Sequence, residues 1–142
     1  MSLRSTHHRV LVADDEPITL LVIRKQLESI GFQAIETAST ATEALRTLRG
    51  HEFGLVICDY MVPPINGLDL RRVMLSNSKW ASIPFIIVTA PSTRARIWPG
   101  CKDIVDDVLA KPFSAARLSM AAARALGDMP KPAEAGDDVF EI

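Results

Sequence analysis

Residues 55–67 read LVICDYMVPPING, an apolar run that ends on a carboxylate and then turns. The run is too short for a typical helix and is β-branched at Val56 and Ile57, which predicts a strand buried on both faces of a parallel sheet. The Pro, Asn and Gly residues beyond Asp59 predict a turn. Because ligands of open α/β sheets bind outside the carboxyl ends of the strands, Asp59 is a candidate functional residue.

A short apolar run followed by a helical pattern occurs five times along the chain. This alternation predicts an α/β domain with a parallel sheet and helices on both faces. Residues 33–38 alternate polar and apolar side chains, as an edge strand does, and Pro99-Gly100 should shorten or bend the fourth helix. The expected strands are 10–13, 33–38, 55–58, 84–88 and 108–110, and the expected helices are 17–30, 41–49, 68–75, 91–103 and 115–126.

Composition describes an ordinary globular protein of 142 residues, with 48% hydrophobic residues, 23% charged residues and a net charge of −1. We therefore expect no nucleic-acid partner and no membrane partner. The two cysteines lie far apart, which fits neither a metal pair nor a disulfide framework and favours a cytoplasmic setting. We expect a disordered N-terminus over residues 1–8, one folded domain over 9–127, and a tail or linker over 128–142.

Polar side chains stand at the carboxyl ends of four of the five expected strands. Asp14 and Asp15 follow the first strand, Asp59 the third, Thr89 the fourth and Lys111 the fifth. Two carboxylates about 4 Å apart repel by roughly 4 kcal/mol at an effective dielectric of 20, and Mg²⁺ relieves such repulsion. A carboxylate also acts as a nucleophile toward phosphorus, and an ammonium and a hydroxyl group would neutralise the transferred group.

These residues closely resemble the receiver domain of two-component response regulators, of the chemotaxis-regulator kind. The matching pieces are VLVADDEP at 10–17, Asp59 with Pro63 and Gly67, IIVTA at 86–90 and KPF at 111–113. The resemblance covers about residues 9–127. It implies a flavodoxin-like, doubly wound sheet of five parallel strands in the order 2-1-3-4-5.

The resemblance implies a signalling domain, not an enzyme beyond its own phosphorylation and dephosphorylation. Asp59 would accept a phosphoryl group from a histidine kinase or a histidine phosphotransfer protein, Lys111 would contact that group, and Thr89 would move toward it as a switch. The output would be an unknown downstream protein, and we expect no DNA-binding module. The Mg²⁺ ligands that the resemblance implies are Asp15, Asp59 and the main-chain carbonyl of Met61, with Asp14 assisting.

The chain departs from the family in the region that receivers commonly use for output. Val108 stands where the family usually has Tyr or Phe, residues 103–105 read DIV in place of Ala-Gly-Ala, and Trp98 precedes Pro99-Gly100 in the fourth helix. One hypothesis is that Trp98 supplies the aromatic that Val108 lacks, and the alternative is that it simply covers a shortened helix. We expect four arginines, at 71, 72, 94 and 96, to lie on solvated faces. For those at 94 and 96, the alternative is that they belong to a surface that binds a partner.

Two other classes of function stay open. The first is a phosphorylation-independent adaptor with the receiver fold, which the unusual output region motivates. The second is an aspartyl-phosphate hydrolase of the haloacid-dehalogenase kind. That family needs a second acid two residues after the nucleophile, where this chain has Met61, so a general acid is missing.

Overall fold

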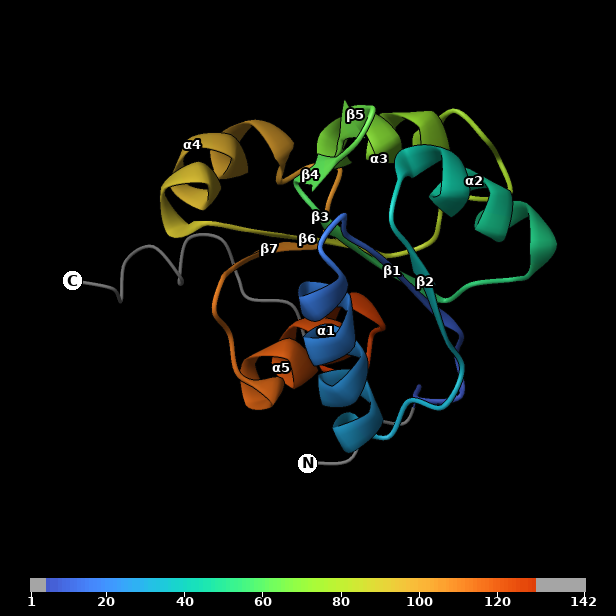
Figure 1. Ribbon diagram of the computed structural model, residues 1–142, viewed down its shortest axis with the longest axis vertical. Coiled ribbons are helices and arrows are strands. Elements are labelled where there is room, and N and C mark those ends of the chain that lie inside the picture. The colour runs from blue at the N-terminus through green and yellow to red at the C-terminus, as the bar shows by residue number, and fades with distance from the viewer. Residues whose placement is uncertain (1–4, 130–142) are drawn as a thin grey trace.

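The computed structural model describes residues 5–129, in which a parallel sheet lies between two layers of helices (Figure 1). Its five strands pair in the order β2-β1-β3-β6-β7, and every pairing is parallel. Strands β4 and β5 form a separate antiparallel hairpin. Without them, β6 and β7 are the fourth and fifth strands of the sheet, so the predicted order 2-1-3-4-5 and the flavodoxin-like fold are confirmed. The strands are β1 (Val10–Ala13), β2 (Ile35–Ala38), β3 (Leu55–Asp59), β4 (Met61–Val62), β5 (Ile65–Asn66), β6 (Phe85–Thr89) and β7 (Asp107–Ala110).

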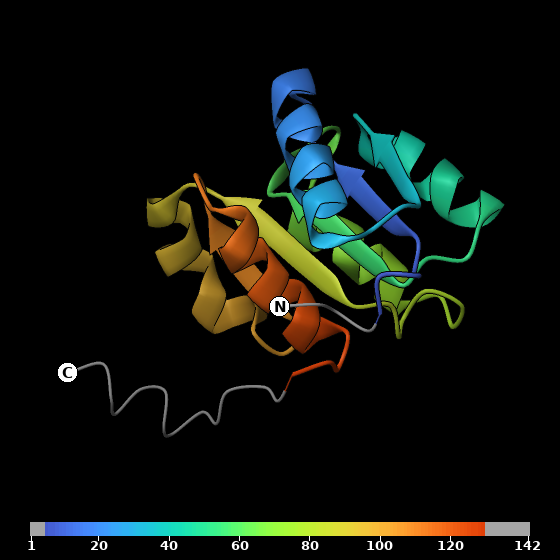
Figure 2. The ribbon, with the colours of Figure 1, turned by 90° about the horizontal axis from the view of Figure 1, so that it is seen from below.

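Helices cover both faces of the sheet: α2, α3 and α4 lie on one face, and α1 and α5 on the other (Figures 1 and 2). Local sequence sets several helix ends. The Thr40 hydroxyl accepts a hydrogen bond from the Glu43 amide at 3.0 Å, and Gly31 ends α1 with a φ of 121°. The helices are α1 (Pro17–Ile30), α2 (Ala41–Gly50), α3 (Gly67–Leu75), α4 (Pro91–Cys101) and α5 (Ala115–Ala125).

The strands supply alternate side chains to two separate cores. Val56 of β3 points into the core beneath α2, α3 and α4, whereas its neighbours Leu55 and Ile57 point into the core beneath α1 and α5. All three side chains are fully buried. A strand buried on both faces needs an unbroken apolar run, which is why residues 55–58 carry no polar side chain.

Pro99-Gly100 does not interrupt helix α4, as the sequence had suggested it would. The helix continues through both residues to Cys101, although Pro99 has no amide hydrogen to donate within it. The amide of Lys102 closes the last turn of α4 on the Trp98 carbonyl at 3.0 Å. On α3, Val73 is 40% exposed, and the buried residues are Gly67, Leu70, Arg71 and Met74.

Arg71 is buried, contrary to the solvated face expected for it. Its guanidinium donates to the main-chain carbonyls of Ile104 at 2.6 Å and Ile83 at 2.9 Å, and it lies 5.4 Å from the centroid of the Phe85 ring. A buried cation needs such partners. The side chain therefore ties α3 to the two loops that precede β6 and β7.

The two ends of the described chain meet at the amino edge of the sheet. The Ser5 amide and hydroxyl donate to the Asp128 carboxylate at 3.1 and 3.0 Å. The proposed domain limits stay a prediction, since residues 1–4 and 130–142, which hold most of the expected tail, lie outside the described residues. Within 5–129, every helix is too short or too polar to cross a lipid bilayer.

Gly67 allows the start of α3 to approach the end of β3. Its amide donates to the Tyr60 carbonyl at 2.7 Å. A Cβ at this position would stand 2.8 Å from the Asp59 carbonyl oxygen and 3.4 Å from the Cys58 sulfur. Only a residue without a side chain fits between the helix and the strand end that carries Asp59.

We predict that Gly67→Ala lowers the free energy of unfolding by about 1–3 kcal/mol, the usual cost of forcing a methyl group into a packed site. Urea denaturation measures the change. Gly100→Ala is the matched control, because a Cβ there meets nothing within 4 Å and alanine favours a helix. Equal stability of the two variants would show that the close approach at Gly67 is unimportant.

Candidate functional site

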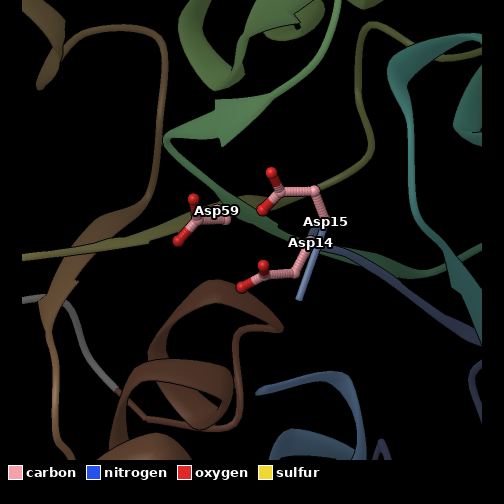
Figure 3. Close-up of side chains that lie close together, drawn as sticks. All are labelled: Asp14, Asp15 and Asp59. Atoms are coloured by element: carbon pink, nitrogen blue, oxygen red, sulfur yellow. The ribbon is translucent and has the colours of Figure 1, made fainter. Parts of the chain in front are cut away.

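Three carboxylates meet at the carboxyl edge of the sheet. Asp14 and Asp15 directly follow β1, and Asp59 is the last residue of β3. These two strands pair in parallel with Ala13 opposite Cys58, which places Asp14 beside Asp59. One carboxylate oxygen from each of the three residues lies within 4.8 Å of the others (Figure 3). The predicted convergence of the three acids is therefore present.

The ammonium group of Lys111 bridges the two buried acids. Its Nζ lies 2.5 Å from Asp59 Oδ1 and 3.2 Å from Asp14 Oδ2. Lys111 follows β7, two strands away from β3 in the sheet. Its amide donates to the Thr89 carbonyl at 2.7 Å, which fixes the backbone from which the long side chain reaches across β6.

Burial differs sharply among the charged groups of this site. Asp14 is 1% exposed and Asp59 7% exposed, whereas Asp15 is exposed. Burial raises the pKa of Asp14, and the Asp59 charge raises it further, while the Glu16 amide and Lys111 oppose the rise. Burial lowers the pKa of Lys111, but the hydrogen bond and charge of Asp59, with the charge of Asp14, outweigh it and the net pKa is raised. Lys111 therefore remains an ammonium.

The carboxylate oxygens of both buried acids have defined partners. Asp59 Oδ2 accepts from the Met61 amide at 2.7 Å, and Asp14 Oδ1 accepts from the Glu16 amide at 2.9 Å. When ionised, three carboxylates and one ammonium leave two negative charges at this edge. A cluster of hard oxygen ligands with that excess fits a divalent cation such as Mg²⁺.

The other residues predicted for the site lie around this cluster. Thr89 ends β6, the strand between β3 and β7, so its place in the sheet is between Asp59 and Lys111; it is 7% exposed. Met61 begins the β4 hairpin, and its side chain is 61% exposed. Burial raises the pKa of the Cys58 thiol, which donates to the Asp59 carbonyl at 3.1 Å. It remains a protonated, buried thiol, as its apolar strand suggested.

The region around β7 shows a contact that the sequence did not reveal. Val108 is fully buried, and Trp98 is partly buried against the same core cluster. Arg94 donates through Nε to the Val108 carbonyl at 2.6 Å, so it does not lie on a solvated face as expected. No sequence signal marks this pairing, because the acceptor is a main-chain carbonyl 14 residues along the chain.

An exposed apolar patch on α1 was also missed. Ile18 is 77% exposed, Leu21 51% and Val22 49%, and the helix begins three residues after Asp14. These residues have the i, i+3, i+4 spacing of one helical face, distinct from the buried face that carries Ile23 and Leu27. The sequence did carry a signal for this patch, because these three residues form an apolar stripe on α1 in addition to the stripe that faces the core.

Comparisons with known proteins agree on one family. The family model described as the response regulator receiver domain matches residues 10–123. A probable chemotaxis protein CheY of Rhizobium etli is 27% identical over 113 residues, which cover 80% of this chain and 88% of the relative.

Solved structures give the same result. A response regulator receiver domain protein from Clostridium thermocellum has a TM-score of 0.74 at 30% identity, covering 85% of this chain and 95% of that protein. The receiver domain of the sensor histidine kinase PA1611 from Pseudomonas aeruginosa has a TM-score of 0.74 at 24% identity, covering 85% of this chain and 98% of that domain. The Pseudomonas domain has a magnesium ion coordinated in its active-site cleft.

The raised pKa of Asp14 predicts the effect of removing its charge. The pKa of Asp14 is higher in the folded chain than its ordinary value of 3.8. Such a carboxyl group lowers the free energy of unfolding as the pH rises from 3.8 through the raised pKa. Without metal, Asp14→Asn should therefore raise the free energy of unfolding at pH 7 by about 1 kcal/mol, a common scale for one substitution. The gain should shrink as the pH falls toward that ordinary value.

Urea denaturation in EDTA at several pH values measures this change. Asparagine keeps an oxygen that can accept from the Glu16 amide, so the substitution removes mainly the charge. Asp103→Asn, at an exposed acid, is the control and should give no comparable gain. A loss of stability at pH 7 in Asp14→Asn would contradict the assigned cost of the buried charge.

Proposed function

The chain belongs to the response regulator receiver family, and from this premise we propose that Asp59 accepts a phosphoryl group from a histidine kinase or a histidine phosphotransfer protein, in a Mg²⁺-dependent reaction. One observation carries the proposal. The Lys111 ammonium lies 2.5 Å from Asp59 Oδ1, and the carboxylates of Asp14 and Asp15 lie close to Asp59. A nucleophile, a fixed cation and the ligands for a second cation are the parts that phosphoryl transfer needs.

In the proposed reaction, a carboxylate oxygen of Asp59 attacks the phosphorus of a phosphohistidine. The new P–O bond forms as the P–N bond breaks, and the electron pair returns to the imidazole nitrogen of the donor. Lys111 binds an oxygen of the transferred group, and the Thr89 hydroxyl donates to another. Mg²⁺ held by Asp14, Asp15, Asp59 and the main-chain carbonyl of Met61 would neutralise phosphoryl charge, as the ion in the active-site cleft of the Pseudomonas receiver suggests.

The proposed output is a change in the surface around α4 and β7. Thr89 would move toward the phosphoryl group, and the change would pass to the segment that holds Val108 and Trp98. Val108 lacks an aromatic ring that could swing, but Trp98 packs on the same core cluster, and Arg94 binds the Val108 carbonyl. These contacts support a role for Trp98 in switching, with a downstream protein as the partner.

The exposed patch of Ile18, Leu21 and Val22 supports a protein as the phosphoryl donor. Its helix begins just beyond the acidic cluster, so a helical partner that covers the patch could bring its phosphohistidine to Asp59. Two free, buried cysteines fit a reducing compartment, and we place the reaction in the cytoplasm.

The alternatives have less support. A haloacid-dehalogenase-like hydrolase needs an acid two residues beyond the nucleophile, and Met61 offers only an exposed thioether. An adaptor that works without phosphorylation is favoured only by the missing aromatic at position 108. It does not explain why two buried carboxylates share one ammonium, an arrangement that is costly without a chemical use.

We predict that acetyl phosphate and Mg²⁺ add the mass of one phosphoryl group to the wild-type chain. Asp59→Asn should abolish the addition, since an amide oxygen is a poor nucleophile. Asp69→Asn, at an exposed acid of α3, should leave it unchanged. Intact-protein mass spectrometry measures the change. An unmodified wild-type chain under conditions that label a known receiver would favour the adaptor.

We also predict that Ile18→Asp slows phosphorylation by a cognate phosphohistidine protein about tenfold or more, because a charge in an apolar contact costs more than 1.4 kcal/mol. Phosphorylation by acetyl phosphate should stay at the wild-type rate, since the small donor needs no docking surface. Leu75→Asp, at an exposed apolar residue of α3, is the matched control. Equal losses with both donors would place the defect in the site and not in the patch.

A further inference from the structure

A groove lies at the edge of the sheet opposite the acidic cluster. It has a volume of about 1130 Å³ and is bordered by the C-terminal ends of α2 and α3 and by the segments that precede β3 and β6. Its apolar lining consists of Leu48, Phe53, Val73, Trp80 and Ile83. Val73 of α3, which is 40% exposed, contributes its side chain to this groove.

The rim of this groove carries an excess of positive charge. Arg49 and Lys79 are both exposed and line it from opposite sides, one from α2 and the other from the loop after α3. Glu52 is the single acid among the lining residues, so the rim has a net charge of +1 with His51 neutral. A fitting ligand would combine acidic groups with large apolar side chains.

This chain contains a segment with that chemistry outside the described residues. Residues 137–142 read DDVFEI, three acids interleaved with Val, Phe and Ile. We propose that this segment binds in the groove of its own chain, with its apolar side chains over Val73 and Trp80 and its acids at Arg49 and Lys79. Such binding does not depend on phosphorylation of Asp59.

The last described residues lie on the correct side of the molecule for such binding. Asp128 accepts two hydrogen bonds from Ser5, and His8, three residues further on, packs directly over Gly54. Gly54 is the neighbour of Phe53 in the groove lining. These contacts lead along the amino edge of the sheet from the end of α5 to the groove.

The chain beyond Met129 is long enough to reach the groove. Nine residues, 130–138, lie between Met129 and Val139. The ten steps from one to the other span up to about 33 Å when extended, close to the diameter of a small domain. Binding within one chain also gives a high effective concentration, so a weak interaction suffices.

The test compares the full chain with a chain that ends at Met129, both with Trp98→Phe so that Trp80 is the single tryptophan. In the full chain, the backbone amide signals of residues 49–53 and 76–80 and the emission of Trp80 should differ from those of the shortened chain. A synthetic peptide of residues 133–142, added to the shortened chain, should restore the full-chain signals. About 1 M salt should weaken its binding, because it screens the charges.

Charge reversal separates specific binding from a general effect of the tail. Arg49→Glu with Lys79→Glu should weaken peptide binding at least tenfold, and a peptide with both aspartates changed to lysine should regain it. Lys102→Glu, at an exposed lysine outside the groove, should change nothing. Identical spectra for the full and shortened chains with no peptide binding would overturn the proposal. So would signals that depend on protein concentration, which would place the segment on a second copy.

Discussion

The carboxylates of Asp14 and Asp59 lie side by side and are almost inaccessible to water. The ammonium group of Lys111 contacts both and offsets the cost of burying them together. Burial penalises the charge of Asp14, and repulsion from the neighbouring Asp59 charge adds to the cost. The hydrogen bond from the Lys111 amide to the Thr89 carbonyl therefore helps to hold the ammonium in place at the site.

The parallel order of the strands is what brings these groups together. Asp14 and Asp59 are 45 positions apart in the sequence, yet β1 and β3 pair directly, so the two strand ends are neighbours. Lys111 follows β7, and β6 lies between β7 and β3. A long, flexible side chain is needed to cross the intervening strand, which suits lysine better than a shorter or more rigid cation. The geometry of the site thus follows from strand order and side-chain length.

The sequence predicted the features that depend on local pattern. Apolar runs gave the strands, and the positions of Asp14, Asp59 and Lys111 at strand ends gave the cluster. The sequence did not predict where Arg71 and Arg94 lie, because both bind main-chain carbonyls that are 10 to 33 residues away and carry no side-chain signature. Helix α4 was misjudged because the packing of the whole fold can outweigh the local cost of a proline.

The contact between Arg94 and Val108 bears on how a receiver without the usual aromatic could transmit a signal. A phosphoryl group on Asp59 would add negative charge beside Lys111 and draw it further from Asp14. Lys111 is tied to the end of β6 through Thr89, and β6 pairs with β7, which holds Val108. A shift of β7 would move the Val108 carbonyl relative to the guanidinium of Arg94, which lies on α4 and donates to it. The hydrogen bond from the Arg94 side chain to the Val108 carbonyl would then couple the proposed change to α4 without a ring at position 108.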